Sequence, residues 1–305
     1  MNSPVTSRPQ DREAIGSALG DPANPMGLDG IEFIEYATSA PQALGQVLET
    51  MGFRPVARHR SREVLLYRQG ELNVVVNAHP ADVEAAQAAH GAPAIAAIAL
   101  RVRDARAAFE RVRERGGWEV ATHPEVMELN IPAIHGPGAS RIYFVDRYRE
   151  FSIYDVDFVP IPTVDRHPPP VAGLHFFGVV QYIGPWRSAD WIEFYRELFG
   201  FETIPDGQRF GIMHKGTLMV APALEPRNRF MLQLVESEPD VPDVDERLQR
   251  VGLGAPDVAV AVRELSRRGV EFVQAQDGLA NVRGALTRTC LGSVAFELVQ
   301  HQEAA

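Results

Sequence analysis

The chain of 305 residues has a single cysteine, Cys290, and no long apolar run. One cysteine cannot form an intramolecular disulfide, and this usage fits the reducing cytosol, so we expect a cytoplasmic location. No apolar stretch approaches the roughly 20 residues that a membrane-spanning helix needs. Residues 1–25 lack the apolar segment of a signal peptide, and their proline, serine, glycine and charged residues predict a disordered lead.

The sequence also lacks an excess of basic residues. Its 30 Lys and Arg residues stand against 40 Asp and Glu residues, which gives a formal net charge of −10 at pH 7. Nucleic acids and anionic membranes attract basic surfaces, so neither is an expected partner. Hydrophobic residues make up 45% of the chain and charged residues 23%, which is ordinary globular composition. The length suits two domains, each able to bury a core.

Two pairs of segments repeat one pattern of apolar strand, polar turn, amphipathic helix and terminal glycine. Residues 27–53 correspond in this way to residues 173–201, and residues 95–120 correspond to residues 248–273. Within each helix the apolar residues recur at helical spacing, and the glycine that follows suits a left-handed helix end. The sequence therefore predicts an α+β protein in which each half contains two strand–helix–strands modules.

A proline-rich segment separates the two halves. Residues 159–172 contain five prolines, which favour an extended chain that pairs poorly with strands. We expect residues 151–158 and 294–301 to form the matching last strands of the two halves. The predicted organisation is a lead at 1–25, an N-terminal domain at 26–158, a linker at 159–172, a C-terminal domain at 173–301 and a tail at 302–305.

The first half resembles the N-terminal domain of bacterial 4-hydroxyphenylpyruvate dioxygenases. The similar segments are residues 24–37, 51–80, 127–134 and 145–160. This family belongs to the vicinal-oxygen-chelate (VOC) superfamily, and the resemblance implies two VOC domains, each of paired βαβββ modules that curl a sheet around a cavity. It also implies a homo-oligomer. The resemblance further implies that the N-terminal domain is structural and carries no metal, with Phe33, Ala97 and Tyr154 at the positions equivalent to ligands.

In the C-terminal half the resemblance implies an iron site made by two histidines and one glutamate. Glu297, in the run GSVAFELVQ, is similar to the last of these ligands. The positions that correspond to the histidines are occupied by Val179 and Arg250. Valine has no lone pair, and the guanidinium of arginine stays protonated and cannot bind a cation. The chain thus resembles an iron dioxygenase from which most of the iron site has been removed.

Three interpretations of this half stay open. In the first, Arg250 and Glu297 face each other as a catalytic pair, without a metal cofactor. Arg250 then docks a small carboxylate substrate, an aromatic or 2-oxo acid, and Glu297 acts as general acid or base. In the second, the protein is an Fe(II) dioxygenase in which His214 substitutes as a ligand beside Glu297. In the third, it is a non-catalytic binding or partner protein in which the ion pair only holds the fold.

Further residues are predicted to complete the substrate site. Alternation along a strand places His175, Phe177, Val179 and Gln181 on one face. Gln181 is then a candidate for orienting a substrate, and His214 is expected on a neighbouring strand. The candidate substrate-binding residues are Arg250, Gln181, His214, Phe230 and Phe296, with Met213 and Met219 as further apolar lining. In the first half, RHRSRE and MELNIPAI are interpreted as motifs for folding and subunit contacts.

Overall fold

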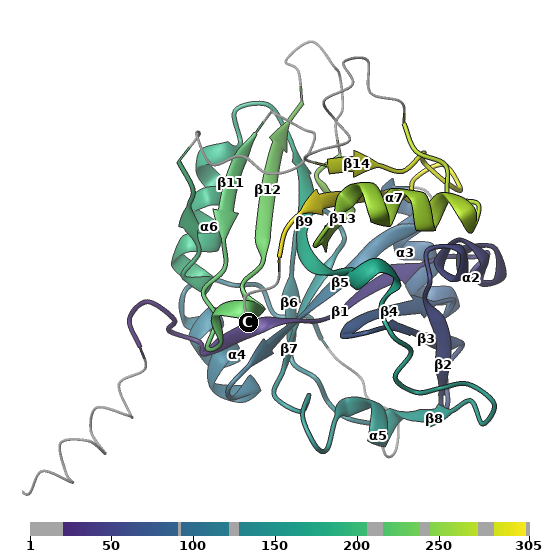
Figure 1. Ribbon diagram of the computed structural model, residues 1–305. Helices are drawn as coiled ribbons and strands as arrows, with labels where there is room; N and C mark the ends of the chain where they lie inside the picture. The colour runs from purple at the N-terminus through teal and green to yellow at the C-terminus, as the bar shows by residue number, and fades with distance from the viewer. Residues whose placement is uncertain are drawn as a thin grey trace, which may run out of the picture.

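The computed structural model describes residues 21–90, 93–121, 128–205, 216–237, 245–273 and 284–302. These residues form two mixed β-sheets with helices packed against them (Figure 1). The first sheet has the order β6-β7-β5-β1-β4-β3-β2-β8, and the second has the order β10-β11-β12-β9-β13-β15-β14. The architecture is α+β with two VOC-type domains, so the predicted fold is confirmed.

The elements alternate along the chain as the repeats predict. The N-terminal elements are β1 (Leu28–Ala37), α2 (Pro41–Thr50), β2 (Arg54–His59), β3 (Val64–Gln69), β4 (Leu72–Asn77), α3 (Pro80–His90), β5 (Ala94–Val102), α4 (Ala105–Glu114), β6 (Ala133–His135), β7 (Arg141–Val145), α5 (Ile153–Asp157) and β8 (Phe158–Pro160). The C-terminal elements are η1 (Val171–Gly173), β9 (His175–Ile183), α6 (Ser188–Phe199), β10 (Glu202–Thr203), β11 (Thr217–Val220), η2 (Pro226–Asn228), β12 (Met231–Glu236), β13 (Arg247–Ala255), α7 (Val258–Arg267), β14 (Gly284–Leu286) and β15 (Phe296–Gln300). None of the helices in the described ranges has the length and apolar character needed to cross a bilayer.

Strand pairing is equivalent in the two sheets. In the first, β1 pairs in parallel with β4 and antiparallel with β5, and β5 pairs in parallel with β7. In the second, β9 pairs in parallel with β12 and antiparallel with β13, and β13 pairs in parallel with β15. The repeat seen in the sequence is therefore also a repeat of topology, and it allows positions in the two domains to be matched by register.

One large hydrophobic core joins the two domains. It takes residues from both sheets and from α2, α4, α6 and α7, and it includes Ile34, Phe144, Phe199, Val251 and Phe296. A second, smaller core contains Phe33, Val75, Ala99 and Phe158, and belongs to the N-terminal domain alone. Because successive side chains of a strand point to opposite faces, the first sheet buries one face against the shared core and turns the other toward the smaller one.

The segment predicted as the last strand of the first half is a helix. Residues 153–157 form α5, which begins at Ser152 with a capping box completed by Asp155, and both α5 and β8 lie at the bottom of Figure 1. The reciprocal contacts of that box satisfy free N–H groups of a helix start, which favours a helix over a strand. The strand β8 begins at Phe158, the last residue of the predicted N-terminal domain, continues into the predicted linker and pairs with β2. The counterpart of β15 is β7, since each pairs in parallel with the strand that opens the second module.

Candidate functional site

Three central strands of the C-terminal sheet place Gly178, Gly252 and Glu297 in one row. Gly252 on β13 is paired with Gly178 on β9 and with Glu297 on β15. Val179 is paired with Val251 and therefore lies on the opposite face of the sheet, among the residues of the shared core. The sequence resemblance placed Val179 at the position of the first ligand, beside Glu297. In the structure Gly178, one residue earlier, occupies that position, so this assignment was wrong.

Arg250 and Glu297 form a buried ion pair on this face. Nε of Arg250 donates to Oε2 of Glu297 at 2.9 Å, and Nη2 lies 2.9 Å from the same oxygen. Each residue exposes only 3% of its surface. Nη2 has no hydrogen bond of good geometry, and Nη1 makes one long contact of 3.4 Å with the hydroxyl of Tyr182. The two side chains face each other as the sequence predicts, and the guanidinium keeps donor capacity beyond the pair.

The space beside Glu297 is small. The cavity there has a volume of about 20 Å³, and Gly178, Gly252, Leu218 and Met231 are among the residues that line it. A Cβ added to Gly178 would lie 2.3 Å from the carbonyl oxygen of Met231. A cavity of this size holds about one water molecule, and the row has no room for a side chain at position 178.

Among the residues that the structure describes, Gln181, Phe230 and Phe296, which were also predicted for this site, are not gathered around Glu297. The hydroxyl of Tyr195 on α6 donates to Oε1 of Gln181 at 2.7 Å, so Gln181 faces the helix. Phe296 alternates with Glu297 and lies in the shared core, where Met219 and Phe230 are also buried. His214 and Met213 lie outside the described residues. Arg250 is paired with Val180, so its face is that of Val180 and Gly178, and the residues counted along β9, Val179 and Gln181, lie on the other face.

The two histidines considered as spare ligands pair with each other. Nε2 of His175 lies 2.9 Å from Nδ1 of His301, and the carbonyl oxygen of Gly173 lies 3.1 Å from the other ring nitrogen of His175. In the sheet, His175 is paired with Gly254, beyond the row of Gly252 and Glu297. The sequence expectation that His175 does not replace a ligand beside Glu297 agrees with this placement.

The equivalent rows of the N-terminal sheet carry different chemistry. Phe33 on β1 is paired with Ala99, and Ala99 is paired with Tyr143 on β7, so these residues correspond to Gly178, Gly252 and Glu297. In the neighbouring row, Ala97 is paired with Glu35 and with Arg141. Of the three positions expected to be equivalent to ligands, Phe33 lies in this row, and Ala97 lies in the neighbouring row. The third position is occupied by Tyr143 rather than Tyr154, because Tyr154 is part of α5.

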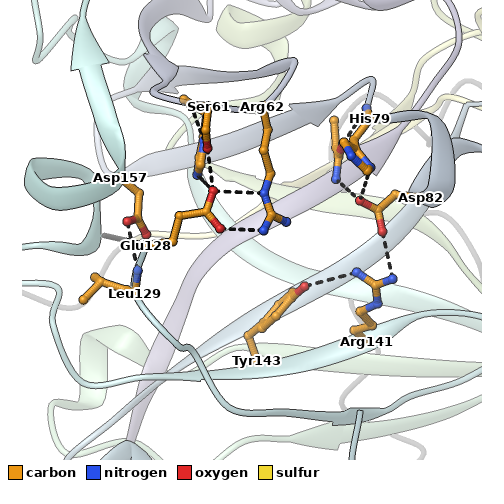
Figure 2. Close-up of polar contacts among 11 residues, drawn as sticks. Ser61, Arg62, His79, Asp82, Glu128, Leu129, Arg141, Tyr143 and Asp157 are labelled. Carbon is orange, nitrogen blue, oxygen red and sulfur yellow. Dashed lines mark hydrogen bonds and ion pairs between the residues drawn. The ribbon is translucent and has the colours of Figure 1, made fainter. Parts of the chain in front are cut away.

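A larger cavity, of about 310 Å³, lies on this face of the N-terminal sheet. Figure 2 shows two polar groups around it. In the first, Arg62 donates to both oxygens of Glu128, from Nε at 3.1 Å and from Nη2 at 2.5 Å. The hydroxyl of Ser61 donates to Glu128 at 2.6 Å. This bidentate pair joins the β2–β3 turn to the segment that follows residue 127, and it commits the guanidinium to its own carboxylate.

The second polar group is built around Asp82 at the start of α3. Nη2 of Arg141 donates to Oδ1 of Asp82 at 2.8 Å, and Nη1 lies 3.4 Å from the hydroxyl of Tyr143. The amide nitrogen of Asn77 donates to Asp82 at 3.1 Å and to Oε1 of Glu35 at 2.9 Å. Burial, with the nearby charge of Glu35, raises the pKa of Tyr143 to about 12, so its hydroxyl stays protonated at neutral pH.

Two further carboxyl groups line the cavity without a cation in direct contact in the described residues. Glu35 and Asp157 each expose 7% of their surface. Burial raises the pKa of Glu35, and the charge of Asp82 adds to this effect. Burial also raises the pKa of Asp157, although the backbone N–H of Leu129 donates to it at 3.1 Å. The motifs RHRSRE and MELNIPAI, interpreted from the sequence as serving folding and subunit contacts, supply Arg62, Glu128 and Leu129 to the lining of this cavity.

Comparison with known proteins places both domains in one family. The sequence profile described as hydroxyphenylpyruvate dioxygenase, HPPD, N-terminal, matches residues 23–159. A 4-hydroxyphenylpyruvate dioxygenase from Pseudomonas aeruginosa is 33% identical over 269 residues, which cover 83% of this chain and 74% of that protein. The chain belongs to the 4-hydroxyphenylpyruvate dioxygenase family.

Other members and relatives of the 4-hydroxyphenylpyruvate dioxygenase family agree with this placement. The enzyme of that name from Pseudomonas sp. strain P.J. 874 is 44% identical over 183 residues, which cover 59% of this chain and about half, 51%, of that protein. A solved structure of a mutant 4-hydroxymandelate synthase from Streptomyces coelicolor superposes with a TM-score of 0.71 over 92% of this chain and 94% of that one. Its sequence identity of 18% supports the shared fold alone.

The family implies Fe(II), and the residues in this row do not fit it. Such a site needs two imidazoles and a carboxylate with open coordination positions. The row offers the carboxylate of Glu297 beside Gly178 and Gly252, and the guanidinium of Arg250 already occupies one oxygen of that carboxylate. Among the residues that the structure describes, no three His, Cys, Asp or Glu side chains are grouped so as to hold a metal ion. A cation next to the only acidic ligand opposes a second cation there.

Proposed function

We propose that this member of the 4-hydroxyphenylpyruvate dioxygenase family acts on a small aromatic or 2-oxo carboxylic acid by proton transfer, without iron at Glu297. The observation that supports this proposal is the contact of Arg250 with Glu297 at 2.9 Å, in a site where both are almost fully buried. The guanidinium places a fixed positive charge at the carboxylate of the row. The names of the relatives suggest the class of substrate, and the guanidinium suits its carboxylate group.

In the proposed mechanism the ion pair is the resting state, and the substrate exchanges partners with it. The carboxylate of a substrate takes the free edge of the Arg250 guanidinium, where Nη2 has no hydrogen bond and Nη1 has only the long contact with Tyr182. A guanidinium binds a carboxylate through two parallel hydrogen bonds, so the incoming group competes well for it. The cavity of about 20 Å³ must widen for this step, and the side chains of Leu218 and Met231 at its wall are the ones to move.

Once its cation is shared, Glu297 becomes the proton acceptor. A buried carboxylate that loses its positive partner has a raised pKa, because burial disfavours the charged form. Glu297 then removes a proton from the carbon beside the carbonyl of a 2-oxo acid. The C–H bond breaks, its electron pair forms the enolate, and the proton moves to the carboxylate. Return of the proton to the enolate oxygen gives the enol, and return to carbon gives the 2-oxo acid with an exchanged proton. Neither step needs an oxidant.

The second candidate is a binding protein without turnover. The same ion pair favours it, because a fully paired Arg250 and Glu297 can serve stability alone. The two candidates differ in proton exchange at the substrate. Incubation with a panel of aromatic 2-oxo acids in D₂O, followed by NMR of the protons on the carbon beside the ketone carbonyl, measures that exchange directly. Calorimetry of the same panel measures binding.

The enzyme proposal expects exchange catalysed by the natural chain and lost in Glu297→Gln, with affinity retained. Arg250→Met is expected to lose affinity itself, and Tyr182→Phe, which removes only a long contact, is the matched control. Binding without exchange supports the second candidate.

The iron content of protein purified under anaerobic, iron-replete conditions tests the iron-free proposal. A content near one atom per chain, with oxygen uptake on 4-hydroxyphenylpyruvate, overturns it. Light scattering of the same preparation tests the proposed homo-oligomer.

A further inference from the structure

The cavity of the N-terminal domain is a polar feature that the proposed function leaves unused. It has a volume of about 310 Å³, comparable to the lower end of small-molecule sites. It lies on the face of the sheet that corresponds to the face of Glu297 in the other domain, as the matched rows of Phe33, Ala99 and Tyr143 establish. The inference drawn from it does not depend on the proposed function of the C-terminal domain.

The cations around this cavity are already paired. Arg62 is held by Glu128 through two hydrogen bonds, and Arg141 is held by Asp82 and contacts Tyr143 (Figure 2). A guanidinium whose donors are committed to its own carboxylate has little left for an incoming anion. The polar groups in Figure 2 therefore do not form an anion site in spite of their two arginines.

The carboxyl groups, in contrast, keep acceptor capacity. Oε1 of Glu35 accepts from Asn77, and no other hydrogen bond to Glu35 is found in the described part of the chain. Asp157 accepts one hydrogen bond, from the backbone of Leu129, through a single side-chain oxygen. Both side chains are more than nine-tenths buried, and both line the cavity. Neither carboxyl group has an oxygen that is both fully buried and without a partner, so the unused oxygen of each is open to a donor in the cavity.

Charge and shape define what kind of ligand donates there. The cavity is lined by four carboxyl groups and two guanidiniums, so with neutral imidazoles and all four carboxyl groups ionised it has an excess of two negative charges. Its other walls are aromatic and aliphatic, with Phe33, Tyr143, Tyr154 and Phe158 among them. Aromatic faces attract cations, and an apolar wall favours a ligand with an apolar body.

We propose that the N-terminal cavity binds a small arylalkyl amine, with its ammonium group on Glu35 and its ring against the aromatic wall. Asp157 is the second carboxyl group available to such a cation. An ammonium group supplies donors for the unused oxygen of Glu35 and a positive charge that opposes the negative excess of the cavity. The site is distinct from the row of Glu297, and its ligand is opposite in charge to the acid proposed there.

The test compares two probes of similar size that differ mainly in charge, tyramine and 4-hydroxyphenylacetate. Isothermal titration of the full chain near pH 8 is expected to show tyramine binding, with the acid at least tenfold weaker. Glu35→Gln, which keeps shape and removes the charge, is expected to weaken tyramine binding at least tenfold. Glu110→Gln is the control, since Glu110 is exposed on α4 and pairs with Arg106 there.

Several outcomes overturn this proposal. One is equal or tighter binding of 4-hydroxyphenylacetate, and another is the absence of tyramine binding at millimolar concentration. Unchanged affinity in Glu35→Gln also contradicts it. If that variant does not fold, as judged by its circular dichroism, Asp157→Asn replaces it and is expected to weaken tyramine binding as well. Displacement of tyramine by a 2-oxo acid in the natural chain indicates one shared site and likewise rejects the inference.

Discussion

Nε of Arg250 lies 2.9 Å from Oε2 of Glu297, and this contact joins β13 to β15 at the centre of the C-terminal sheet. The guanidinium of Arg250 contacts this carboxylate at ion-pair distance. This guanidinium reaches the carboxylate of a row where the family resemblance implies iron. The pair therefore has two testable properties, its contribution to stability and its exclusion of other groups from the row.

Removal of either charge should destabilise the protein. We expect Glu297→Leu alone to lower the free energy of unfolding by roughly 3–5 kcal/mol, because it leaves a buried guanidinium without a partner. The double variant Arg250→Met with Glu297→Leu should lose much less than the sum of the single variants. Urea denaturation of the four proteins of this cycle measures the coupling. Additive losses would show that the two side chains do not interact in solution.

The two glycines of the row should differ in their tolerance of a side chain. A Cβ at Gly178 meets the carbonyl oxygen of Met231 at 2.3 Å, whereas a Cβ at Gly252 has its nearest contact at 3.4 Å. We expect Gly178→Ala to cost about 1–3 kcal/mol, as overpacking does, and Gly252→Ala to cost less than about 1 kcal/mol. Thermal and urea unfolding of both variants test this, and equal costs would mean that β9 and β12 separate easily.

Glu35 should make the stability of the protein depend on pH. Its pKa is raised by burial above the ordinary value of 4.5, so the folded state holds this proton more tightly than the unfolded state. The stability that the protonated carboxyl contributes is complete below pH 4.5 and is lost as the pH rises through the folded-state pKa. The neighbouring charges are Asp82, Arg141 and Arg62.

Glu35→Gln should therefore stabilise the protein relative to the natural chain at pH 8, and much less at pH 4.5. Melting temperatures of both proteins across this interval give the difference directly. The exposed control Glu110→Gln should leave the difference unchanged with pH. If the natural chain instead becomes more stable relative to Glu35→Gln as the pH rises, the raised pKa of Glu35 is contradicted.

The shared core should couple the unfolding of the two domains. Phe199 on α6 is fully buried and stacks on Phe144 of the N-terminal sheet, with ring centroids 6.4 Å apart. We expect Phe199→Ala to lower the free energy of unfolding by about 3–5 kcal/mol, and to shift one common transition rather than that of one domain. Phe151→Ala is the control, since Phe151 is 60% exposed. Two separate calorimetric transitions in the natural chain would refute the coupling.

The fold was predictable because its signals are local and occur twice. The spacing of apolar residues in 27–53 recurs in 173–201, and the glycines at the helix ends recur with it. The failures also have local causes. The segment 151–158 has an apolar pattern suited to a strand, but Ser152 and Asp155 cap a helix there. The resemblance set the register of β9 one residue late, and alternation along the strand then carried Gln181 to the same wrong face as Val179.

The sequence by itself determined the chemistry that the C-terminal row lacks, since residue identities alone show that arginine stands where the resemblance implies histidine. Tertiary structure alone decided which groups meet. Register put Gly178 and Gly252 beside Glu297, and folding brought Glu35, Asn77, Asp82 and Arg141 together from β1, β4, α3 and β7. The reason is physical, because strand pairing and buried polar contacts join residues that are distant in the chain, and periodicity along one segment carries no information about its partners.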